Sequence, residues 1–179
     1  MIILVGASAS GKTEVAKHLA RHFHIKKVIT HTTRPMREHE QQDIDYHFVS
    51  KQDFFVLKSQ NTFVETTQYN GNYYGTSKKE IGDQKCLIVD PNGLHAFQQL
   101  HDPHLVTFLL VAEEETRKKR MISRGDSLEN VEKRIAGDRK DFSQDAIGSI
   151  DFLISTDTMT IEEITNQIYT LYKNKLSQL

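Results

Sequence analysis

The sequence predicts an α/β fold in which helices flank a parallel central sheet, and three observations indicate it. Short apolar runs that suit buried strands recur at residues 2–5, 27–30, 86–89, 105–111 and 152–155. Helical patterns lie between or after the later runs, at 94–100, 113–122, 128–142 and 160–177. A glycine-rich turn joins the first run to a first helix, whose expected buried stripe is Val15, Ala16, Leu19 and Phe23. Strands that alternate with helices in this way form parallel βαβ units.

Length and composition indicate one soluble globular domain of 179 residues, 37% hydrophobic and 26% charged. With 23 Lys and Arg against 24 Asp and Glu, the net charge of −1 argues against nucleic-acid and membrane-surface partners, which require a basic excess. The single cysteine, Cys86, excludes an internal disulfide and suits a reducing cytoplasm. The chain has neither an apolar run of about 18 residues nor a basic leader, so we expect neither a membrane span nor a signal peptide.

Residues 31–80 differ from the rest of the chain and predict a small insertion with short strands of its own. This segment is polar and rich in Thr, Arg, Gln and Tyr. Asn70 and Gly71 lie between two β-prone runs, which is a strong hairpin signal. A helix is expected near 51–58, where Phe54, Phe55 and Leu57 could pack.

The glycine-rich turn matches the pattern GxxxxGK[ST] that cradles the phosphates of a nucleoside triphosphate. Glycines let backbone N–H groups converge on phosphate oxygens, and the start of the following helix adds positive potential. Lys12 would reach the β- and γ-phosphates, and the Thr13 hydroxyl would bind Mg²⁺. The predicted ATP-binding residues are Gly6, Ala7, Ser8, Ala9, Ser10, Gly11, Lys12 and Thr13. The pattern does not indicate what happens to the triphosphate.

A second cluster, in residues 30–40, indicates a binding site for another phosphate group. Arg34 and Arg37 lie three residues apart and follow a run of hydroxyl side chains. Two guanidinium groups beside hydroxyls suit a dianionic phosphate monoester. A solvated loop is the alternative interpretation of the same residues.

A third run, Glu65 followed by the sequence GNYYGT at 71–76, completes a resemblance to the guanylate kinase family. The phosphate loop, TTRPMREHE at 32–40, DYHF at 45–48, this run and RMISRG at 120–125 occur in that family's order over nearly the whole chain. The resemblance implies the P-loop nucleoside monophosphate kinase fold. That fold would have a core of 1–30, 81–119 and 141–179, a GMP-binding insertion at about 31–80 and an arginine-rich lid at about 120–140.

The resemblance implies Mg²⁺-dependent transfer of the γ-phosphoryl group of ATP to GMP, which gives ADP and GDP. On the family pattern, the GMP phosphate is held by Thr30, Arg34, Arg37, Tyr46 and Tyr74, and the guanine base is read by Glu65, Thr76 and Asp90. The catalytic cations would be Lys12, Arg34, Arg120, Arg124 and Arg134. A carboxylate can accept from guanine N1–H and N2–H₂ while a hydroxyl donates to O6, and adenine would leave the carboxylate unpaired.

Several alternatives stay open at this point. Ile88 stands where the family commonly has an acid, which keeps open a non-catalytic nucleotide-binding module. A kinase of another phosphorylated acceptor is a further alternative, although Glu65 and Thr76 argue against it. Salt bridges on solvated helix faces could also explain the arginines of 117–139, more so for Arg117 and Arg139. Use of dGMP, and a monomeric or homodimeric state, are not decided by the sequence.

Overall fold

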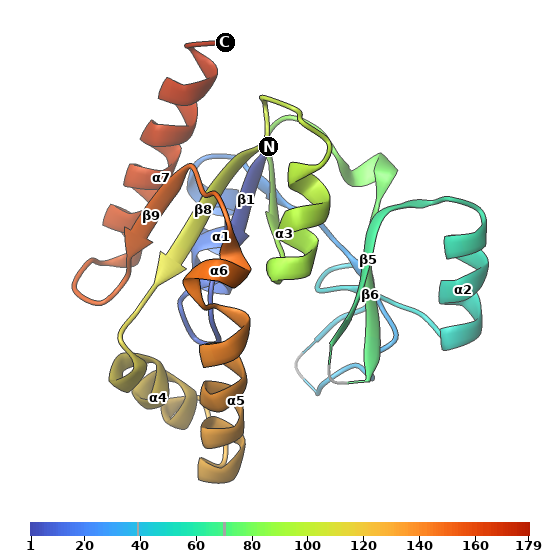
Figure 1. Cartoon of the computed structure of the whole chain (residues 1–179), viewed down its shortest axis with the longest axis horizontal. Coiled ribbons are helices and arrows are strands. Elements are labelled where there is room, and N and C mark those ends of the chain that lie inside the picture. Colours follow the sequence, from blue (N-terminus) through green and yellow to red (C-terminus); the bar gives the residue numbers. More distant parts are fainter. Residues whose placement is uncertain (39, 70) are drawn as a thin grey trace.

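The computed structural model describes residues 1–38, 40–69 and 71–179, and a five-stranded parallel sheet lies at its centre (Figure 1). Each neighbouring pair of strands in this sheet is parallel, which confirms the predicted α/β fold. A parallel sheet is covered on both faces, which explains why its strands are apolar on both sides. The order is β2 (Lys26–Lys27), β7 (Lys85–Ile88), β1 (Ile2–Val5), β8 (Val106–Val111) and β9 (Phe152–Ser155).

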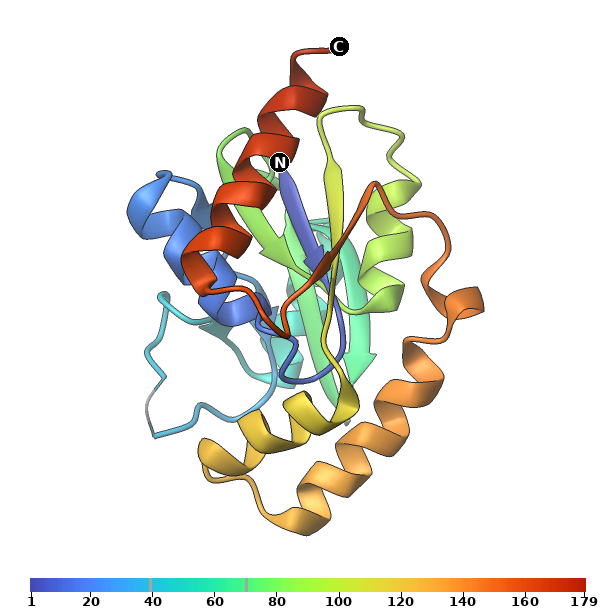
Figure 2. The ribbon, with the colours of Figure 1, turned by 90° about the vertical axis from the view of Figure 1, so that its left-hand side faces the viewer.

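Helices cover the two faces of the central sheet (Figure 2), and the side chains of β1 belong alternately to the apolar clusters on the two faces. On one face, α1 (Lys12–His22) and α7 (Ile161–Leu176) pack in one apolar cluster with Ile2 and Leu4. On the other face, α3 (Pro91–Gln98) and α6 (Gln144–Ile147) pack in a second cluster with Ile3 and Val5. The two clusters hold the sheet between layers of helix. Because all of its strands are parallel, their carboxyl ends share one edge of the sheet.

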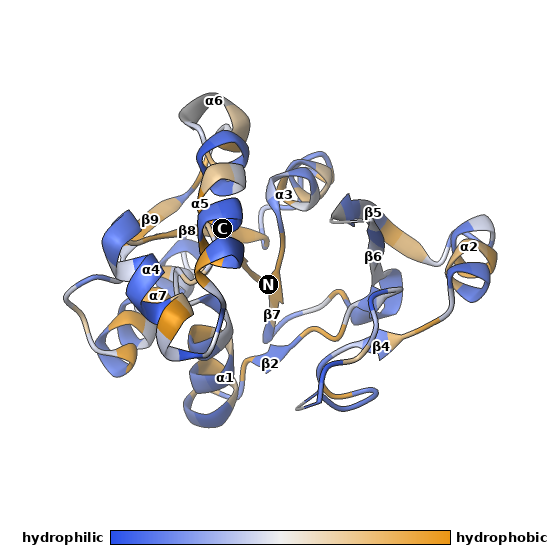
Figure 3. Ribbon diagram, turned by 90° about the horizontal axis from the view of Figure 1, so that it is seen from below, coloured by the Kyte–Doolittle hydropathy of each residue, from blue (hydrophilic) through white to orange (hydrophobic). Residues whose placement is uncertain are grey.

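A second, four-stranded sheet lies to one side of the central sheet together with α2 (Lys51–Ser59), as Figure 3 shows. Its order is β4 (His47–Phe48), β3 (His31–Thr32), β6 (Asn72–Ser77) and β5 (Phe63–Tyr69). Strands β5 and β6 form the predicted antiparallel hairpin, although Asn70 of the predicted turn lies outside the described residues. The ring of Phe54 stacks on those of Phe63 and Tyr73, at 4.9 and 5.7 Å, and so attaches α2 to the hairpin. A 3₁₀ turn, η1 (Lys78–Glu80), leads back towards β7.

Two helices, α4 (Glu114–Ser123) and α5 (Leu128–Asp141), lie beyond the carboxyl end of β8 (Figure 1). Their facing side chains Met121, Val131 and Ile135 form a small apolar cluster, and Ala9 of the phosphate loop packs against it. These helices therefore rest on the loop that joins β1 to α1.

Some predicted elements differ from the observed ones at their ends. The strand expected at 27–30 is Lys26–Lys27, because the Val28 N–H makes one more bond to the Cys86 carbonyl (2.8 Å) and the chain then leaves the sheet. The helix expected at 94–100 begins at Pro91, which is its first residue after the Asp90 N-cap. The four-residue α6 was not predicted. Ile161, the first residue of α7 after the Thr160 cap, is 37% exposed, whereas Ile164 and Ile168 of the same helix are buried.

Candidate active site

One cleft of 1370 Å³ brings together nearly all of the predicted site residues. It extends from the phosphate loop to the second sheet on one side and to α4 and α5 on the other. Its volume exceeds that of a typical single-ligand pocket, so the space suits two nucleotides. Ala7 and Ser10 do not line it, and Ser10 is fully buried. The predicted residues that line it are Gly6, Ser8, Ala9, Gly11, Lys12, Thr13, Thr30, Arg34, Arg37, Tyr46, Glu65, Tyr74, Thr76, Asp90, Arg120, Arg124 and Arg134.

Backbone geometry explains why small residues occupy the phosphate loop. Gly6 has φ 154°, and a β-carbon there would lie 2.3 Å from the carbonyl oxygen of Leu110. Gly11 precedes α1 with φ 98°, in the region that glycine adopts without strain. The loop therefore lies close to β8 and turns the N-terminus of α1 towards the cleft, which is the arrangement that binds phosphate.

The ammonium group of Lys12 is directed into its own loop. Its Nζ donates to the carbonyl oxygens of Gly6 (2.6 Å) and Ala7 (2.8 Å). Burial lowers the pKa of Lys12 to about 8, an effect that the nearby carboxylate of Asp138 opposes and that Arg117 and Arg124 reinforce. At pH 7 the group is therefore still mostly protonated and can bind an anion.

On the opposite side, Arg34 is held by Glu40, the last residue of the TTRPMREHE run, to which the sequence analysis assigned no role. The Arg34 Nη2 donates to Glu40 Oε1 (2.7 Å), and the Arg37 N–H donates to Oε2 of the same carboxylate (2.9 Å). Although burial acts against both ionised forms, their hydrogen bond raises the pKa of Arg34 and lowers that of Glu40. Glu40 thus fixes the Arg34 side chain relative to the backbone at Arg37.

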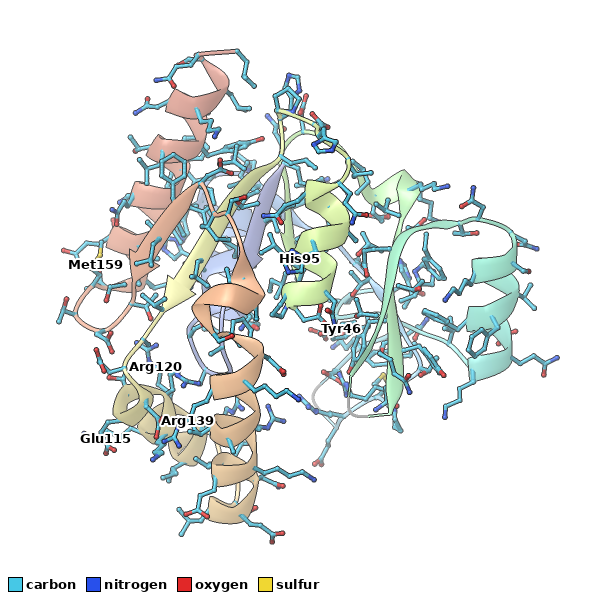
Figure 4. The ribbon with its side chains drawn as sticks, viewed as in Figure 1. Tyr46, His95, Glu115, Arg120, Arg139 and Met159 are labelled. Carbon is cyan, nitrogen blue, oxygen red and sulfur yellow. The ribbon has the colours of Figure 1, made fainter. Side chains whose placement is uncertain are left out.

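Aromatic rings form the floor beside Arg34. The Arg34 guanidinium lies 5.4 Å from the ring centre of Tyr46, and the ring of Tyr74 meets that of Tyr46 edge-on at 6.3 Å. Lys27, a second residue that the sequence did not single out, also lines the cleft. Its Nζ lies 5.1 Å from the Tyr46 ring and donates to the backbone carbonyl of Asp45 (3.0 Å). Figure 4 shows Tyr46 on the side of the second sheet and Arg120 on the side of α4.

Glu65 and Thr76 are register partners on β5 and β6 and already contact each other. Glu65 Oε1 accepts from the Thr76 hydroxyl (2.6 Å) and from the Thr76 N–H (3.1 Å). Burial raises the pKa of Glu65, the Thr76 hydroxyl opposes this, and the carboxylate of Asp90 adds to it. No described residue donates to Glu65 Oε2, so this oxygen can accept from a ligand. The single hydroxyl proton of Thr76 points to Glu65, so the predicted donation to O6 requires this hydroxyl to rotate.

Asp90 has a structural contact beside its predicted role. Its Oδ1 accepts from the Gly93 N–H (2.7 Å) and caps α3, which leaves Oδ2 with no donor among the described residues. Asp90 and Glu65 therefore present two acceptor oxygens from two different elements to the same cleft.

The three predicted lid arginines differ in how they are held. Arg120 donates to the Thr156 carbonyl (2.5 Å) and hydroxyl (3.0 Å) and to the Ala9 carbonyl (3.2 Å). Arg124 pairs with Asp126 at 2.5 Å. Arg134 lines the cleft and has no hydrogen-bond or ion-pair partner among the residues that the structure describes. Its donors are therefore available to an anion.

Arg117 is buried, at 7% exposure, and so does not lie on a solvated helix face. It forms a 2.7 Å ion pair with Asp138, which is 6% exposed and contacts the phosphate loop through Ser8. The signal for this pair was its helical spacing, because Arg117 lies four residues before buried Met121, and Asp138 lies three residues after buried Ile135. Arg139, in contrast, is exposed and pairs with Glu114 at 2.8 Å. This is the salt bridge on a solvated helix face that the sequence analysis gave as the alternative for Arg139.

The chemistry of the loop fits Mg²⁺, which typically takes one or two protein oxygens together with substrate phosphates. Thr13 offers one such oxygen at the start of α1 and lines the cleft. Among the described residues there is no cluster of three or more His, Cys, Asp or Glu side chains that could bind a metal by itself. None of the described helices is both long and apolar enough to cross a membrane.

Comparison with known proteins identifies the family of this chain. The family model for guanylate kinase matches residues 1–175. A guanylate kinase of Neisseria meningitidis serogroup A is 32% identical over 171 residues, which are 91% of this chain and 82% of that protein. Another, from Nitrosococcus oceani, is 36% identical over 146 residues, 77% of this chain and 71% of that protein. The crystal structure of guanylate kinase from Anaplasma phagocytophilum has the same fold, with a TM-score of 0.76 at 23% identity over 98% of this chain and 85% of that one. This chain belongs to the guanylate kinase family.

Proposed function

We propose that this chain transfers the γ-phosphoryl group of Mg²⁺-bound ATP to GMP and releases ADP and GDP. The observation that carries the proposal is the cleft itself, in which a phosphate loop faces a second cationic group and the carboxylates of Glu65 and Asp90. Phosphoryl transfer requires two substrates in line, and one cleft with two phosphate-binding sides meets that requirement.

On the donor side, the loop from Gly6 to Thr13 would bind the triphosphate through the start of α1 and through backbone N–H groups other than that of Ser8, which donates to Asp138. Lys12 would exchange its contacts with the loop carbonyls for phosphate oxygens. The Thr13 hydroxyl would hold Mg²⁺, which neutralises charge on the β- and γ-phosphates when it is bound.

On the acceptor side, Arg34 and Arg37 would bind the GMP phosphate, with Tyr46, Tyr74 and Thr30 around it. Glu40 supports this role because it orients Arg34 and still leaves three of the five guanidinium donors for the ligand. A guanidinium over an aromatic floor presents its donors in a fixed plane, which suits a phosphate with several acceptor oxygens.

Base selection would come from Glu65 with Asp90 and Thr76. The available Oε2 of Glu65 would accept from guanine N1–H and N2–H₂. Adenine has an unprotonated N1 at that position and would leave a buried carboxylate without a donor. A site of this kind rejects the wrong base by about 10⁴-fold when the missing bond leaves a buried polar group unpaired.

Chemistry at the transferred group needs no general base. The second pKa of a phosphate monoester is about 6, so GMP already carries an ionised oxygen as the nucleophile at pH 7. Arg120, Arg124 and Arg134 would stabilise the charge that develops on the equatorial oxygens. We infer that an insertion of about 31–80 and a lid of about 120–140 close onto the core of 1–30, 81–119 and 141–179, which excludes water from the reacting phosphates.

A cytoplasmic enzyme, with ATP and GMP as its partners and no nucleic acid or membrane, agrees with the balanced charge of the chain. Ile88 lines the cleft where the family commonly has an acid, so it bears on how efficiently Mg²⁺ is used.

The test is formation of ADP by purified protein with ATP, Mg²⁺ and a panel of acceptors: GMP, dGMP, AMP and sugar phosphates. We expect turnover with GMP, loss of turnover when EDTA removes Mg²⁺, and little turnover with AMP. Turnover with a sugar phosphate alone would identify a kinase of another acceptor. Binding of GMP and ATP without turnover would identify a non-catalytic module and contradict the proposal.

A further inference from the structure

The helices that carry the lid arginines are joined to the phosphate loop by a buried ion pair. Arg117 of α4 and Asp138 of α5 lie 2.7 Å apart, and both are shielded from solvent. Asp138 Oδ2 accepts from the Ser8 N–H (2.9 Å), and Oδ1 accepts from the Ser8 hydroxyl (3.2 Å). Arg117 Nη1 lies 3.4 Å from the Ser8 carbonyl oxygen. The pair therefore contacts Ser8 through both of its backbone polar groups and its side chain.

Such an arrangement restrains the conformation of the loop. Two side chains from outside the loop bond the backbone N–H and the backbone carbonyl of one half-buried loop residue. Ser8 lies two residues after Gly6 and four before Lys12, within the segment that would surround the phosphates. A change in the position of α4 or α5 therefore changes the contacts of the loop directly.

Charge adds a second consequence. Asp138 lines the same cleft as Lys12, and its carboxylate favours the protonated form of that lysine. An uncompensated carboxylate at this place would repel a triphosphate. Arg117 neutralises this carboxylate. Removal of one partner of a buried ion pair reduces stability much more than removal of both partners.

We propose that Arg117 and Asp138 are a positioning pair for the donor nucleotide, which holds Ser8 in its phosphate-binding conformation and couples the lid helices to the loop. This inference rests on the proposed function. The pair acts on ATP through Ser8 and lies away from Arg34 and Glu65, so its loss affects ATP binding and leaves GMP binding unchanged.

A double-mutant cycle tests the pair. The variants are Arg117→Met, Asp138→Ala and the double variant, with the dissociation constants of a non-hydrolysable ATP analogue and of GMP measured by calorimetry. We expect Arg117→Met to weaken the ATP analogue about tenfold or more, where each factor of ten is 1.4 kcal/mol. Asp138→Ala should weaken it less, because no unpaired anion is left. The double variant should bind at least about threefold better than Arg117→Met, since removal of Asp138 relieves the repulsion.

Two further variants separate positioning from a general loss of stability. Arg117→Lys keeps the positive charge and should recover most of the ATP binding that Arg117→Met loses. Arg139→Ala breaks the exposed pair with Glu114, which joins the same two helices at the surface, and should leave both dissociation constants unchanged. If Arg117→Met does not fold, Ser8→Ala removes one hydrogen bond without leaving a buried charge, and should weaken ATP about twofold to tenfold.

The inference is overturned if the pair variants bind the ATP analogue as the unmodified protein does, if GMP binding falls as much as ATP binding, or if the two single effects add in the double variant. The binding readout does not need turnover. Unmodified protein that binds ATP but forms no GDP would contradict the proposed function and leave the positioning pair testable by the same cycle.

Discussion

Replacement of Glu65 by Gln tests the reading of the guanine base most directly. The amide has the same shape, and its oxygen can still accept from the Thr76 hydroxyl and N–H, at 2.6 and 3.1 Å. Its NH₂ then lies where Oε2 would accept from guanine, and donors face donors. A hydrogen bond to a charged group contributes about 1.5–3 kcal/mol, so the loss of one or two lowers kcat/KM for GMP by about 10–10⁴-fold.

The assay measures kcat/KM for GMP, the dissociation constant of ATP and the melting temperature of Glu65→Gln. The control variant is Glu38→Gln, because Glu38 is an exposed carboxylate in the same segment and does not line the cleft. Burial raises the pKa of Glu65, so ionisation of this carboxyl lowers the free energy of unfolding as the pH rises. The melting temperature of Glu65→Gln at pH 7.5 should therefore be no lower than that of the unmodified protein. As the solution of unmodified protein is acidified, Glu65 becomes protonated at a higher pH than an ordinary glutamate, because its pKa is raised. The KM for GMP should therefore begin to rise at that higher pH. An ATP affinity that falls as much as GMP use, or GMP use that is unchanged, would refute the role of Glu65.

Two other predictions concern residues whose contacts are as well defined. Glu40→Ala removes the acceptor that orients Arg34, so KM for GMP should rise about tenfold while ATP binding stays constant; calorimetry with both nucleotides measures this, and equal weakening of both would contradict it. Gly6→Ala brings a β-carbon to 2.3 Å from the Leu110 carbonyl at positive φ, so the protein should lose about 3 kcal/mol or more of stability. An unchanged urea midpoint would show that the loop does not approach β8 as described.

The central fold could be predicted because its sequence signals are local. Strands buried on both faces are continuous apolar runs, and 152–155 and 106–111 match their predicted bounds within one residue. Apart from the hairpin of β5 and β6, the pairing in the second sheet could not be predicted, since it depends on contacts between distant residues such as His31 with His47 and Gly75. The short α6 also escaped prediction, because four residues are too few to display a helical period.

The candidate site was predictable where a motif carries the residues together, as in the phosphate loop. Residue type alone does not identify the site roles of Glu40, Lys27 and the pair of Arg117 with Asp138, since charged side chains are common on solvated surfaces. What distinguishes them is partnership across the fold: Arg117 and Asp138 are 21 residues apart in the sequence and meet only because α4 and α5 pack against each other.

The cationic side chains of the cleft also differ in whether they must give up existing hydrogen bonds to bind a phosphate. An arginine has five donors, so Arg34 and Arg120 can keep their contacts with Glu40 and Thr156 and still bind phosphate. Lys12 has three, and its nearest acceptors are Gly6 and Ala7 of its own loop, so ATP must displace at least one of these contacts. An anion beside Lys12 would also raise its pKa from about 8.

ATP binding should therefore take up protons, and the uptake should grow with pH. A lysine with a pKa of about 8 is half protonated at pH 8, so binding that restores full protonation takes up about half a proton there and about a tenth at pH 7. Calorimetric titrations of Mg²⁺-bound ATP in buffers of different ionisation enthalpy measure this number directly. The same measurement with GMP serves as the control, because no lysine is proposed to bind the GMP phosphate and guanidinium groups do not lose their protons in proteins. An uptake that is constant from pH 7 to 9 would mean that Lys12 does not exchange its loop carbonyls for the triphosphate.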